Sequence, residues 1–166
     1  MLFHAKKKTS ENWVPYLEVG GKRLEIISHT KYLGFIVDDK LSFKEHIHQT
    51  CANLRKWVSI FRKLAPLLTV ETKYTVYNSL FCSKLLYGIE LYGNASKKTL
   101  SNLQTIQNRA LKSLFSYPKL FHTKDLYADL NIDCISTLFK CNALLLLRKL
   151  LYEERAPQNV HHLIKS

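Results

Sequence analysis

The spacing of hydrophobic and polar residues changes from strand-like alternation near the start of the chain to a helical period after residue 41. From there, apolar side chains recur at steps of three and four residues, which is typical of amphipathic helices. The first such stretch carries Phe43, Ile47, Cys51, Leu54, Val58 and Phe61. We predict Ser42 as the N-cap of this helix, with Glu45 as its capping-box partner, and Pro66 as the residue that stops it.

The same period predicts two more helices in the middle of the chain. One begins after Thr69 and ends near Gly88 or Gly93. The next follows Ser96, carries apolar residues on one face, and ends before Pro118. Together with the first helix, these segments can form a bundle.

The end of the chain is predicted to hold a short helix and then a long one. The short helix covers residues 124–130, and the long one begins at Asp133 and continues to about Arg155. Residues 144–147 are all leucine, so the long helix is apolar on nearly every side. A helix that is apolar all round is normally buried, and we therefore expect this one at the centre of the bundle.

The first part of the chain has the pattern of strands. Two alternating runs flank Gly20 and Gly21, a pair that suits a two-residue hairpin turn. The aromatic and β-branched run from residue 32 to residue 37 predicts a third strand, closed by a turn at Asp38 and Asp39. The predicted fold class is α+β, mainly α: a short β-hairpin and a third strand, followed by a helical bundle.

Composition and charge narrow the class of partner. The 166 residues are 46% hydrophobic, enough for one packed core, and 25 Lys and Arg against 13 Asp and Glu give a net charge of +12. Such a balance favours nucleic acid as the partner. The longest apolar run, residues 143–147, is far shorter than the roughly 20 residues of a membrane span, so no membrane partner is expected. The four cysteines lack metal-binding spacing and are interpreted as reduced core thiols.

Few residues suggest catalysis. Adjacent carboxylates such as Asp38 and Asp39 can hold Mg²⁺, but they can equally mark the turn between a strand and a helix. Two-metal chemistry needs another carboxylate from a separate strand, and no aspartate precedes Asp38. His46 and His48 fall on different faces of the predicted helix, so they do not form a zinc pair. We predict no catalytic residue and no metal ligand.

Basic residues line one face of the first predicted helix, opposite its apolar stripe. They stack at steps of four, seven, four and three residues: Lys44, His48, Arg55, Ser59 and Arg62. The adjacent row is Gln49, Asn53, Lys56 and Lys63. Only Glu45 offsets six positive residues between positions 40 and 63, which favours phosphate binding over a merely solvated face. Tyr32 is the aromatic residue expected beside the nucleic acid, whereas residues 6–8, all lysine, suit either a phosphate contact or exposed charge.

Several segments resemble, in order and spacing, the end of the palm and the start of the thumb of non-LTR (LINE-type, jockey-like) retrotransposon reverse transcriptases. The resemblance covers nearly the whole chain. Its segments are L-E-V-G-G-K-R-L-E at 17–25, K-Y-L-G-F-I-V-D at 31–38, L-S-F-K-E-H-I at 41–47, Y-G-I-E-L-Y-G-N at 87–94 and L-Q-T-I-Q-N-R-A-L at 103–111.

The resemblance implies a division of the chain and a set of partners. Residues 1–41 correspond to a palm remnant, 42–95 to thumb-like helices and 96–166 to a C-terminal helical extension. The partners would be an RNA template, a DNA primer and the remaining palm and fingers, and the location would be intracellular and nuclear. Mg²⁺ would serve the intact polymerase, with no cofactor held by this chain.

The catalytic F/Y-x-D-D motif of this family would lie on the N-terminal side of Met1. Asp38 and Asp39 resemble it only superficially, because Ile36 stands where the motif has an aromatic residue. We therefore expect a polymerase fragment that positions the primer and binds the template–primer duplex without catalysis, and that is inactive alone. The alternatives are a stand-alone basic nucleic-acid-binding module and an inactive transposon relic.

The predicted nucleic-acid contacts combine the resemblance with the basic helix face. Residues 32–34 would correspond to the primer-grip strand, and the helix after Ser42 to a thumb helix along the duplex. The predicted contact residues are Tyr32, Leu33, Gly34, Lys44, His48, Arg55, Lys56, Arg62 and Lys63.

Overall fold

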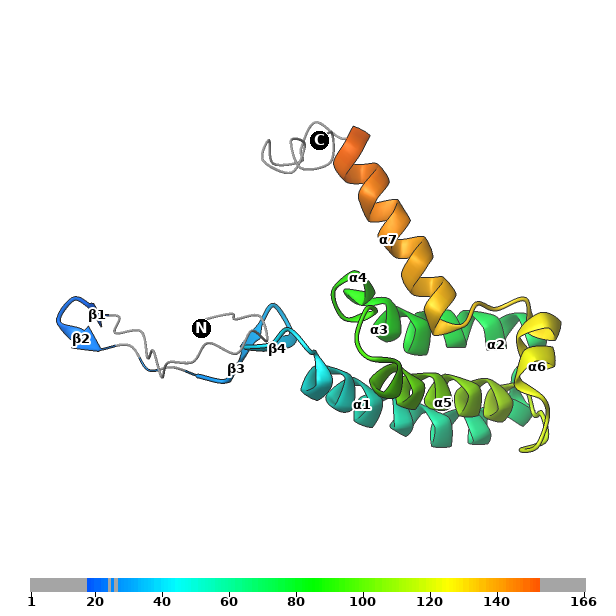
Figure 1. Ribbon diagram of the computed structural model, residues 1–166. Coiled ribbons are helices and arrows are strands. Elements are labelled where there is room, and N and C mark those ends of the chain that lie inside the picture. Colours follow the sequence, from blue (N-terminus) through cyan, green and yellow to red (C-terminus); the bar gives the residue numbers. More distant parts are fainter. Residues whose placement is uncertain (1–17, 24, 26, 153–166) are drawn as a thin grey trace.

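The computed structural model describes residues 18–23, 25 and 27–152, and it is mainly helical (Figure 1). The strands are β1 (Glu18–Val19), β2 (Lys22–Arg23), β3 (His29–Tyr32) and β4 (Phe35–Asp38). The helices are α1 (Lys44–Leu64), the 3₁₀ turn η1 (Ala65–Leu67), α2 (Val70–Val76), the π-helix η2 (Tyr77–Cys82), α3 (Ser83–Leu86), α4 (Ile89–Tyr92), α5 (Lys97–Leu114), α6 (Thr123–Leu130) and α7 (Ile135–Tyr152). The predicted class, α+β and mainly α, is confirmed. The lysines at 6–8 and the predicted helix end near Arg155 lie outside the described residues.

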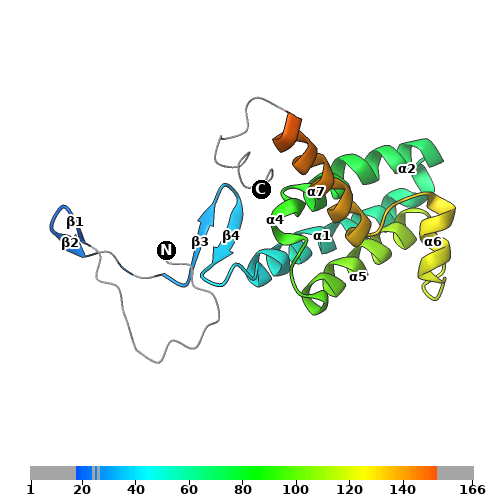
Figure 2. The same cartoon turned by 45° about the horizontal axis from the view of Figure 1, so that its top comes forward.

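The strands form two separate antiparallel hairpins. β1 pairs with β2 around Gly20 and Gly21, whose φ angles of 60° and 76° suit the predicted turn. The prediction of a single third strand over 32–37 is wrong. Leu33 and Gly34, with φ of 46° and 84°, turn the chain inside that run, so that β3 and β4 pair with Tyr32 opposite Phe35. The second hairpin lies beside the first turn of α1 (Figure 2).

The start of α1 is built differently from the predicted capping box. Phe43, not Ser42, occupies the N-cap position, and no side chain there makes a capping bond. Instead the Asp38 carboxylate accepts hydrogen bonds from the backbone N–H groups of Lys40, Ser42 and Phe43 at 3.1, 3.0 and 2.8 Å and from the Ser42 hydroxyl at 3.1 Å. One side chain at the end of β4 therefore organises both the turn and the start of the helix.

This arrangement predicts that Asp38→Ala destabilises the chain by about 2 kcal/mol, the upper range for a lost helix cap. Glu45→Ala is the matched control, because the Glu45 carboxylate makes no capping bond and contacts only His48, at 3.8 Å. Urea unfolding of both variants measures the difference. An equal loss of unfolding free energy in the two variants would indicate that the predicted capping box of Ser42 and Glu45, and not Asp38, stabilises the start of α1.

The next two helices begin where the sequence predicts. The Thr69 hydroxyl accepts from the backbone N–H of Thr72 at 3.3 Å at the start of α2, and the Ser96 hydroxyl accepts from that of Thr99 at 3.3 Å at the start of α5. α2, η2 and α3 follow one another without a break, and Gly88, with φ of 63°, lies just beyond their end. The sequence pattern had not indicated the π-helical stretch.

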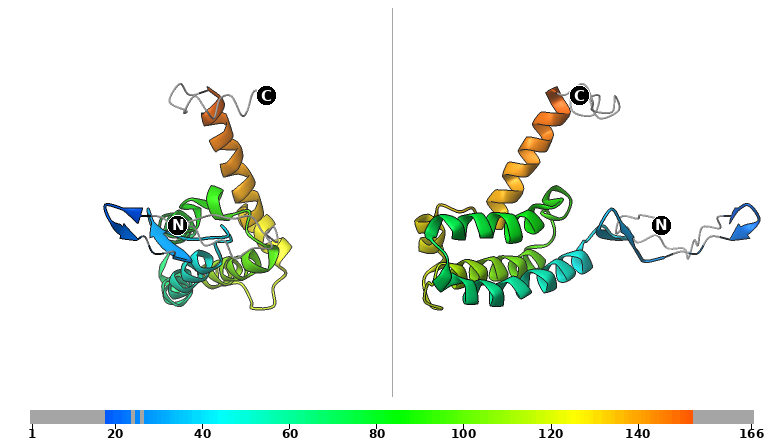
Figure 3. Two further views of the ribbon diagram at one scale, coloured as in Figure 1. Left: turned by 60° about the vertical axis from the view of Figure 1, so that its left-hand side comes forward. Right: turned by 180° about the vertical axis from the view of Figure 1, so that it is seen from behind.

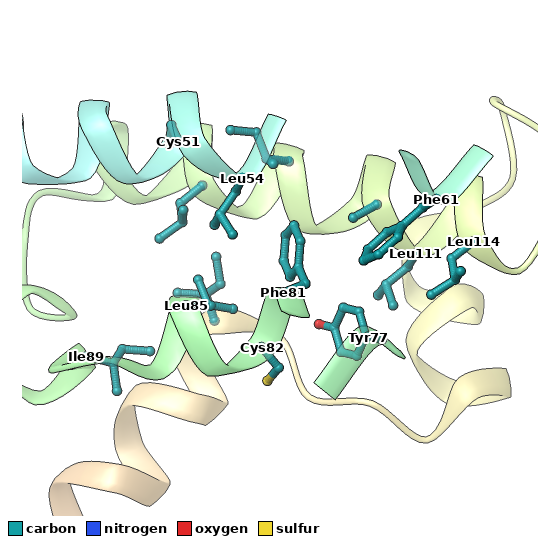
Figure 4. Close-up of a cluster of buried hydrophobic side chains, with 14 of the residues drawn as sticks. Cys51, Leu54, Phe61, Tyr77, Phe81, Cys82, Leu85, Ile89, Leu111 and Leu114 are labelled. Carbon is teal, nitrogen blue, oxygen red and sulfur yellow. The ribbon is translucent and has the colours of Figure 1, made fainter. Parts of the chain in front are cut away.

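The core lies between α1, α5 and the α2–η2–α3 segment (Figure 4). α1 and α5 run side by side, and the α2–η2–α3 segment runs along their common apolar side (Figures 1 and 3). Fully buried side chains from all three include Leu54, Phe61, Tyr77, Phe81, Leu85, Leu111 and Leu114. Helices from the predicted thumb-like part (42–95) and from the predicted C-terminal extension (96–166) thus share one core. The division of the chain at residues 41 and 95 stays a prediction.

The four cysteines are all free, but only Cys51 and Cys82 are buried. Cys134 is half-buried and Cys141 is exposed, so the prediction of core thiols is wrong for these two. Burial raises the pKa of both Cys51 and Cys82, which keeps them protonated and unreactive.

The last helix is not central as predicted. α7 leaves the bundle at its first turn and projects outward (Figures 1 and 3). Ile135 is its only fully buried residue, whereas Leu144 and Leu145 are 64% and 54% exposed. Its first turns stay attached to the bundle: the Ile135 N–H bonds to Gln104 of α5, and a Cβ atom at Gly93 would lie 2.4 Å from the Phe139 ring. The run of four leucines predicted a buried helix, but no other part of the described chain packs over these side chains.

Within the described residues no single helix is long and apolar enough to cross a membrane. α6 and α7 meet the criteria of length and composition only when taken together, and they are bent by 49° at the break between them.

Candidate nucleic-acid interface

The tip of the β3–β4 hairpin projects two apolar side chains into solvent. Tyr32 is 66% exposed and Leu33 is 70% exposed. The tip is nevertheless held in place, because the Tyr87 hydroxyl donates a 2.8 Å hydrogen bond to the Leu33 carbonyl, 54 residues away in sequence. The rings of Tyr87 and Phe35 also stack, with centroids 5.0 Å apart and planes within 6°. The predicted contacts at residues 32–34 thus lie on an exposed but anchored loop.

Gly88 allows this close packing. A Cβ atom on Gly88 would lie 2.1 Å from Cζ and 2.5 Å from Cε1 of Phe35, and the φ of +63° also favours glycine. The segments at 31–38 and 87–94 therefore pack directly on each other. Both were singled out by the family resemblance, and the fold brings them into contact.

His46 completes the support beneath the hairpin. Its ring is 7% exposed, lies 5.0 Å from the Phe35 ring and 5.3 Å from the Tyr92 ring, and accepts a hydrogen bond from the Ile36 N–H through Nδ1 at 3.5 Å. Burial lowers the pKa of His46 from its ordinary value, so the ring is neutral at pH 7. It is a structural residue, whereas His48 is exposed, as their predicted placement on different faces requires.

The lowered pKa of His46 predicts a pH-dependent stability. Near and below the ordinary histidine pKa of 6.5, the unfolded chain binds a proton that the folded chain excludes. Stability is therefore full above this pH and falls as the pH drops toward the lowered pKa. Urea unfolding between about pH 5 and pH 8 should show this decline. His46→Gln should flatten it, and a slope unchanged in that variant would contradict the assignment.

All predicted contact residues on α1 are exposed, namely Lys44, His48, Arg55, Lys56, Arg62 and Lys63. At about 100° per residue, Lys44, Arg55 and Arg62 fall within an arc of about 20° on the helix surface, and the Lys56 and Lys63 row lies further round. The 21 residues of α1 give this surface a length of about 31 Å. We call these six residues the α1 basic face. They are the predicted contact residues that lie on one helix, and the structure leaves all of them exposed to solvent.

The predicted residues divide between two sides of α1. Gly34 lines a pocket of about 420 Å³ together with Gln49 and Asn53 of α1 and Lys84 and Tyr87 beyond it. Arg62, by contrast, lines a pocket shared with α5. The hairpin tip therefore lies beside the first half of α1, near Gln49 and Asn53, whereas Arg62 lies near the last turn of α1 and on another side of it.

Two residues beside the hairpin were missed from the sequence. Lys84 places its ammonium group 5.1 Å from the centre of the Trp57 ring and adds a positive charge to the hairpin pocket. Tyr87 anchors Leu33. Tyr87 stood within the segment at 87–94, which could have drawn attention to it, but only the fold shows its partner. Nothing in the sequence pattern distinguishes Lys84 from other exposed lysines.

The segment at 103–111 has a structural role. Gln107 is fully buried, and its Nε2 donates to the Tyr77 hydroxyl at 3.0 Å and to the Asp133 carbonyl at 2.9 Å. Gln104 accepts from the Ile135 N–H at 3.0 Å. These two amides tie α5 to the π-helix and to the start of α7, so Gln104 and Gln107 of this segment stabilise the bundle.

Asp38 does not fit a Mg²⁺ site. Both of its carboxylate oxygens already accept hydrogen bonds from the turn. Partial burial raises the pKa of Asp38, but the hydrogen bonds from Ser42, Phe43 and Lys40 together lower it by more, so the net pKa lies below its ordinary value. In the part of the chain that the structure describes, no group of three or more His, Cys, Asp or Glu side chains could hold a metal ion.

Comparisons with known proteins agree with the resemblance seen in the sequence. The chain is 30% identical over 122 residues to a protein of Drosophila melanogaster described as a probable RNA-directed DNA polymerase from transposon BS, covering 72% of this chain and 14% of that protein. It is 30% identical over 121 residues to the RNA-directed DNA polymerase from mobile element jockey of the same species, covering 71% and 13%, and 27% identical over 124 residues to the jockey polymerase of Drosophila funebris, covering 73% and 14%.

The chain is thus homologous to a segment of RNA-directed DNA polymerases from mobile elements. Two of those relatives are RNA-directed DNA polymerases from mobile element jockey, which confirms the resemblance to jockey-like polymerases at that level. The chain spans only about one seventh of their length, at 13–14%. No protein-family model matches the chain, and no solved structure matches it with statistical significance.

Proposed function

We propose that this chain acts as part of a non-LTR retrotransposon RNA-directed DNA polymerase. In this role the α1 basic face binds the RNA–DNA duplex, and the tip of the β3–β4 hairpin positions the end of the DNA primer. The homology to the jockey and transposon BS polymerases supports the family. The observation that carries the proposal is that the structure leaves both surfaces exposed: the α1 basic face and the anchored hairpin tip.

The α1 basic face suits a duplex because of its length and its charge. Five lysine and arginine side chains lie along about 31 Å of helix, and Glu45 is the one carboxylate among the residues of α1. Such a row can neutralise successive phosphates, which supplies affinity without reading the base sequence. Binding along a template–primer duplex needs this sequence-independent grip.

The hairpin suits a positioning role because aromatic side chains of the bundle support its tip. Under the tip, the Tyr87 ring stacks on the Phe35 ring, and the His46 ring packs against Phe35 at a tilt of 47°. Tyr32 and Leu33 remain free to contact a ribose or a terminal base above it. A contact that must hold a reacting 3′ end in place gains from such rigid support.

Catalysis is assigned to the rest of the polymerase. The Asp38 carboxylate is occupied by the turn, so the carboxylates that hold Mg²⁺ would come from the remaining palm, with the fingers as a further partner. The isolated chain should therefore not extend a DNA primer on an RNA template in the presence of Mg²⁺. Extension that Asp38→Ala abolishes would overturn this part of the proposal.

Photo-crosslinking tests the placement of the duplex. A hybrid carrying 4-thiothymidine at the primer 3′ end should label residues of the β3–β4 hairpin. The same probe placed about nine base pairs upstream, the span of α1 at about 3.4 Å per base pair, should label residues 55–63. Labelling that does not change with the position of the probe would contradict the proposed orientation, and mass spectrometry of the peptides reads it out.

A further inference from the structure

A second basic site lies where α1 and α5 end. A pocket of about 830 Å³ opens between the last turns of these helices and the loop at 115–123. Its charged lining residues are Arg62, Arg109, Lys112 and Lys119, and it contains no aspartate or glutamate. Tyr117, one of the lining residues, donates a 3.4 Å hydrogen bond to the Asp129 carboxylate.

The loop that forms one wall is fixed by the helix end. Ser116, with φ of 61°, reverses the chain after α5, and the Tyr117 N–H donates to the Lys112 carbonyl at 2.9 Å, the pattern of a Schellman motif. The Lys112 ammonium donates to the carbonyls of Lys119 and Phe121 at 2.8 and 2.7 Å. Lys112 thus holds the wall in place. The side chains of Arg62, Arg109 and Lys119 have no polar partner among the described residues.

The electrostatic balance of this pocket favours an anion. The C-terminal ends of α1 and α5 each contribute about half a negative charge. The four cationic side chains outweigh this fourfold. Threonine, serine and asparagine side chains in the lining add hydrogen-bond donors, which suits phosphate oxygens.

We propose that this pocket, lined by Arg62, Arg109 and Lys119, binds the phosphodiester backbone of a single nucleic-acid strand that continues past the end of the duplex on α1. Arg62 belongs both to the α1 basic face and to the pocket, so the two surfaces are continuous. The volume fits a nucleotide-sized ligand, since ligand pockets span roughly 300–1,000 Å³. Because the site is recessed, a flexible single strand can enter it, whereas the phosphates of a rigid duplex stay on its outer surface.

The inference rests on the proposed function for the duplex, and the test separates the two. The full 166-residue chain is titrated with a blunt RNA–DNA hybrid and with the same hybrid carrying a six-nucleotide single-stranded extension, made in turn as RNA, as DNA and as an abasic strand. The wild-type chain should bind the extended hybrids about tenfold more tightly, the gain from one or two charge-assisted contacts. All three extensions should give this gain, because the phosphates are the ligand.

Arg109→Gln combined with Lys119→Gln should abolish the gain and leave the affinity for the blunt hybrid unchanged. This variant keeps the Lys119 carbonyl that Lys112 holds, so the wall of the pocket is preserved. Lys97→Gln combined with Lys98→Gln is the matched control, because it removes the same charge from exposed positions at the other end of α5. A gain that survives in the Arg109 and Lys119 variant, or that is lost with the abasic extension, overturns the inference. Failure of the blunt hybrid to bind the wild-type chain would instead overturn the proposed function.

Discussion

Replacing Gly88 with alanine is expected to destabilise the chain by about 3 kcal/mol, from two effects that act together. A positive φ costs an alanine roughly 1–2 kcal/mol. The new Cβ would also lie 2.1 Å from the Phe35 ring, and forced overpacking costs about 1–3 kcal/mol. The ring cannot easily move aside, because Tyr87 stacks on it at 5.0 Å and His46 lies 5.0 Å from it.

Gly20→Ala separates the two effects. Gly20 has nearly the same φ, +60°, but nothing lies within 4 Å of its Cβ position. This control should therefore lose only the roughly 1–2 kcal/mol that the positive φ costs. Urea unfolding measures both variants, and limited proteolysis of the β3–β4 hairpin reports whether the tip has come loose. Equal losses at the two glycines would mean that Phe35 does not pack against residue 88.

Gln107→Leu is expected to cost about 3 kcal/mol, because it leaves a buried hydroxyl and a partly buried carbonyl without a donor. The Tyr77 hydroxyl and the Asp133 carbonyl both accept from the Gln107 amide. In the part of the chain that the structure describes, no buried side-chain nitrogen or oxygen lacks a partner, so this variant would create the first such defect. Leucine has a similar size, which limits the change to the lost polarity.

A double variant tests the cause of that loss. Adding Tyr77→Phe to Gln107→Leu removes one of the orphaned groups, so the combined loss should be smaller than the sum of the two single losses. Asn102→Leu, at an exposed position on the same helix, should stay within about 0.5 kcal/mol of the wild type. Strict additivity of the Tyr77 and Gln107 losses would show that their side chains do not interact.

Local signals in the sequence were sufficient for most helices. Two helices were predicted to begin after Thr69 and after Ser96, and in the structure both hydroxyls accept from free N–H groups at these helix starts. Periodicity also identified the buried faces of α1 and α5, since Leu54, Phe61, Ile106 and Leu111 are all buried. Each of these features depends on residues within a few turns of one another.

Features that depend on distant residues were less predictable. The true cap of α1 comes from Asp38, on the preceding strand, and a pattern confined to the helix assigned it to Ser42 and Glu45. The turn at Leu33 was hidden inside a run with high strand propensity. The apolar run of α7 predicted a buried helix, but its leucines are exposed. The pattern of one helix does not specify which other residues cover it.

The candidate interface was predictable in composition and not in arrangement. The spacing of Lys44, Arg55 and Arg62 predicted an exposed face, and the structure leaves all three exposed. Tyr87, which anchors the Leu33 carbonyl, lies 54 residues away from it in sequence. No helical period connects two such positions, so this support for the hairpin tip became visible only in the fold.

The salt dependence of hybrid binding tests the central claim most directly. Affinity of the 166-residue chain for a blunt RNA–DNA duplex should fall steeply between about 50 and 200 mM salt, because the basic residues of α1 displace counterions from phosphates. Arg55→Gln combined with Lys56→Gln should reduce the slope of log affinity against log salt by about two, one for each lost phosphate contact. Lys97→Gln combined with Lys98→Gln should leave the slope unchanged. A flat salt response of the wild-type chain, or a slope that the α1 variant does not alter, would contradict the assignment of α1 as the surface that holds the duplex.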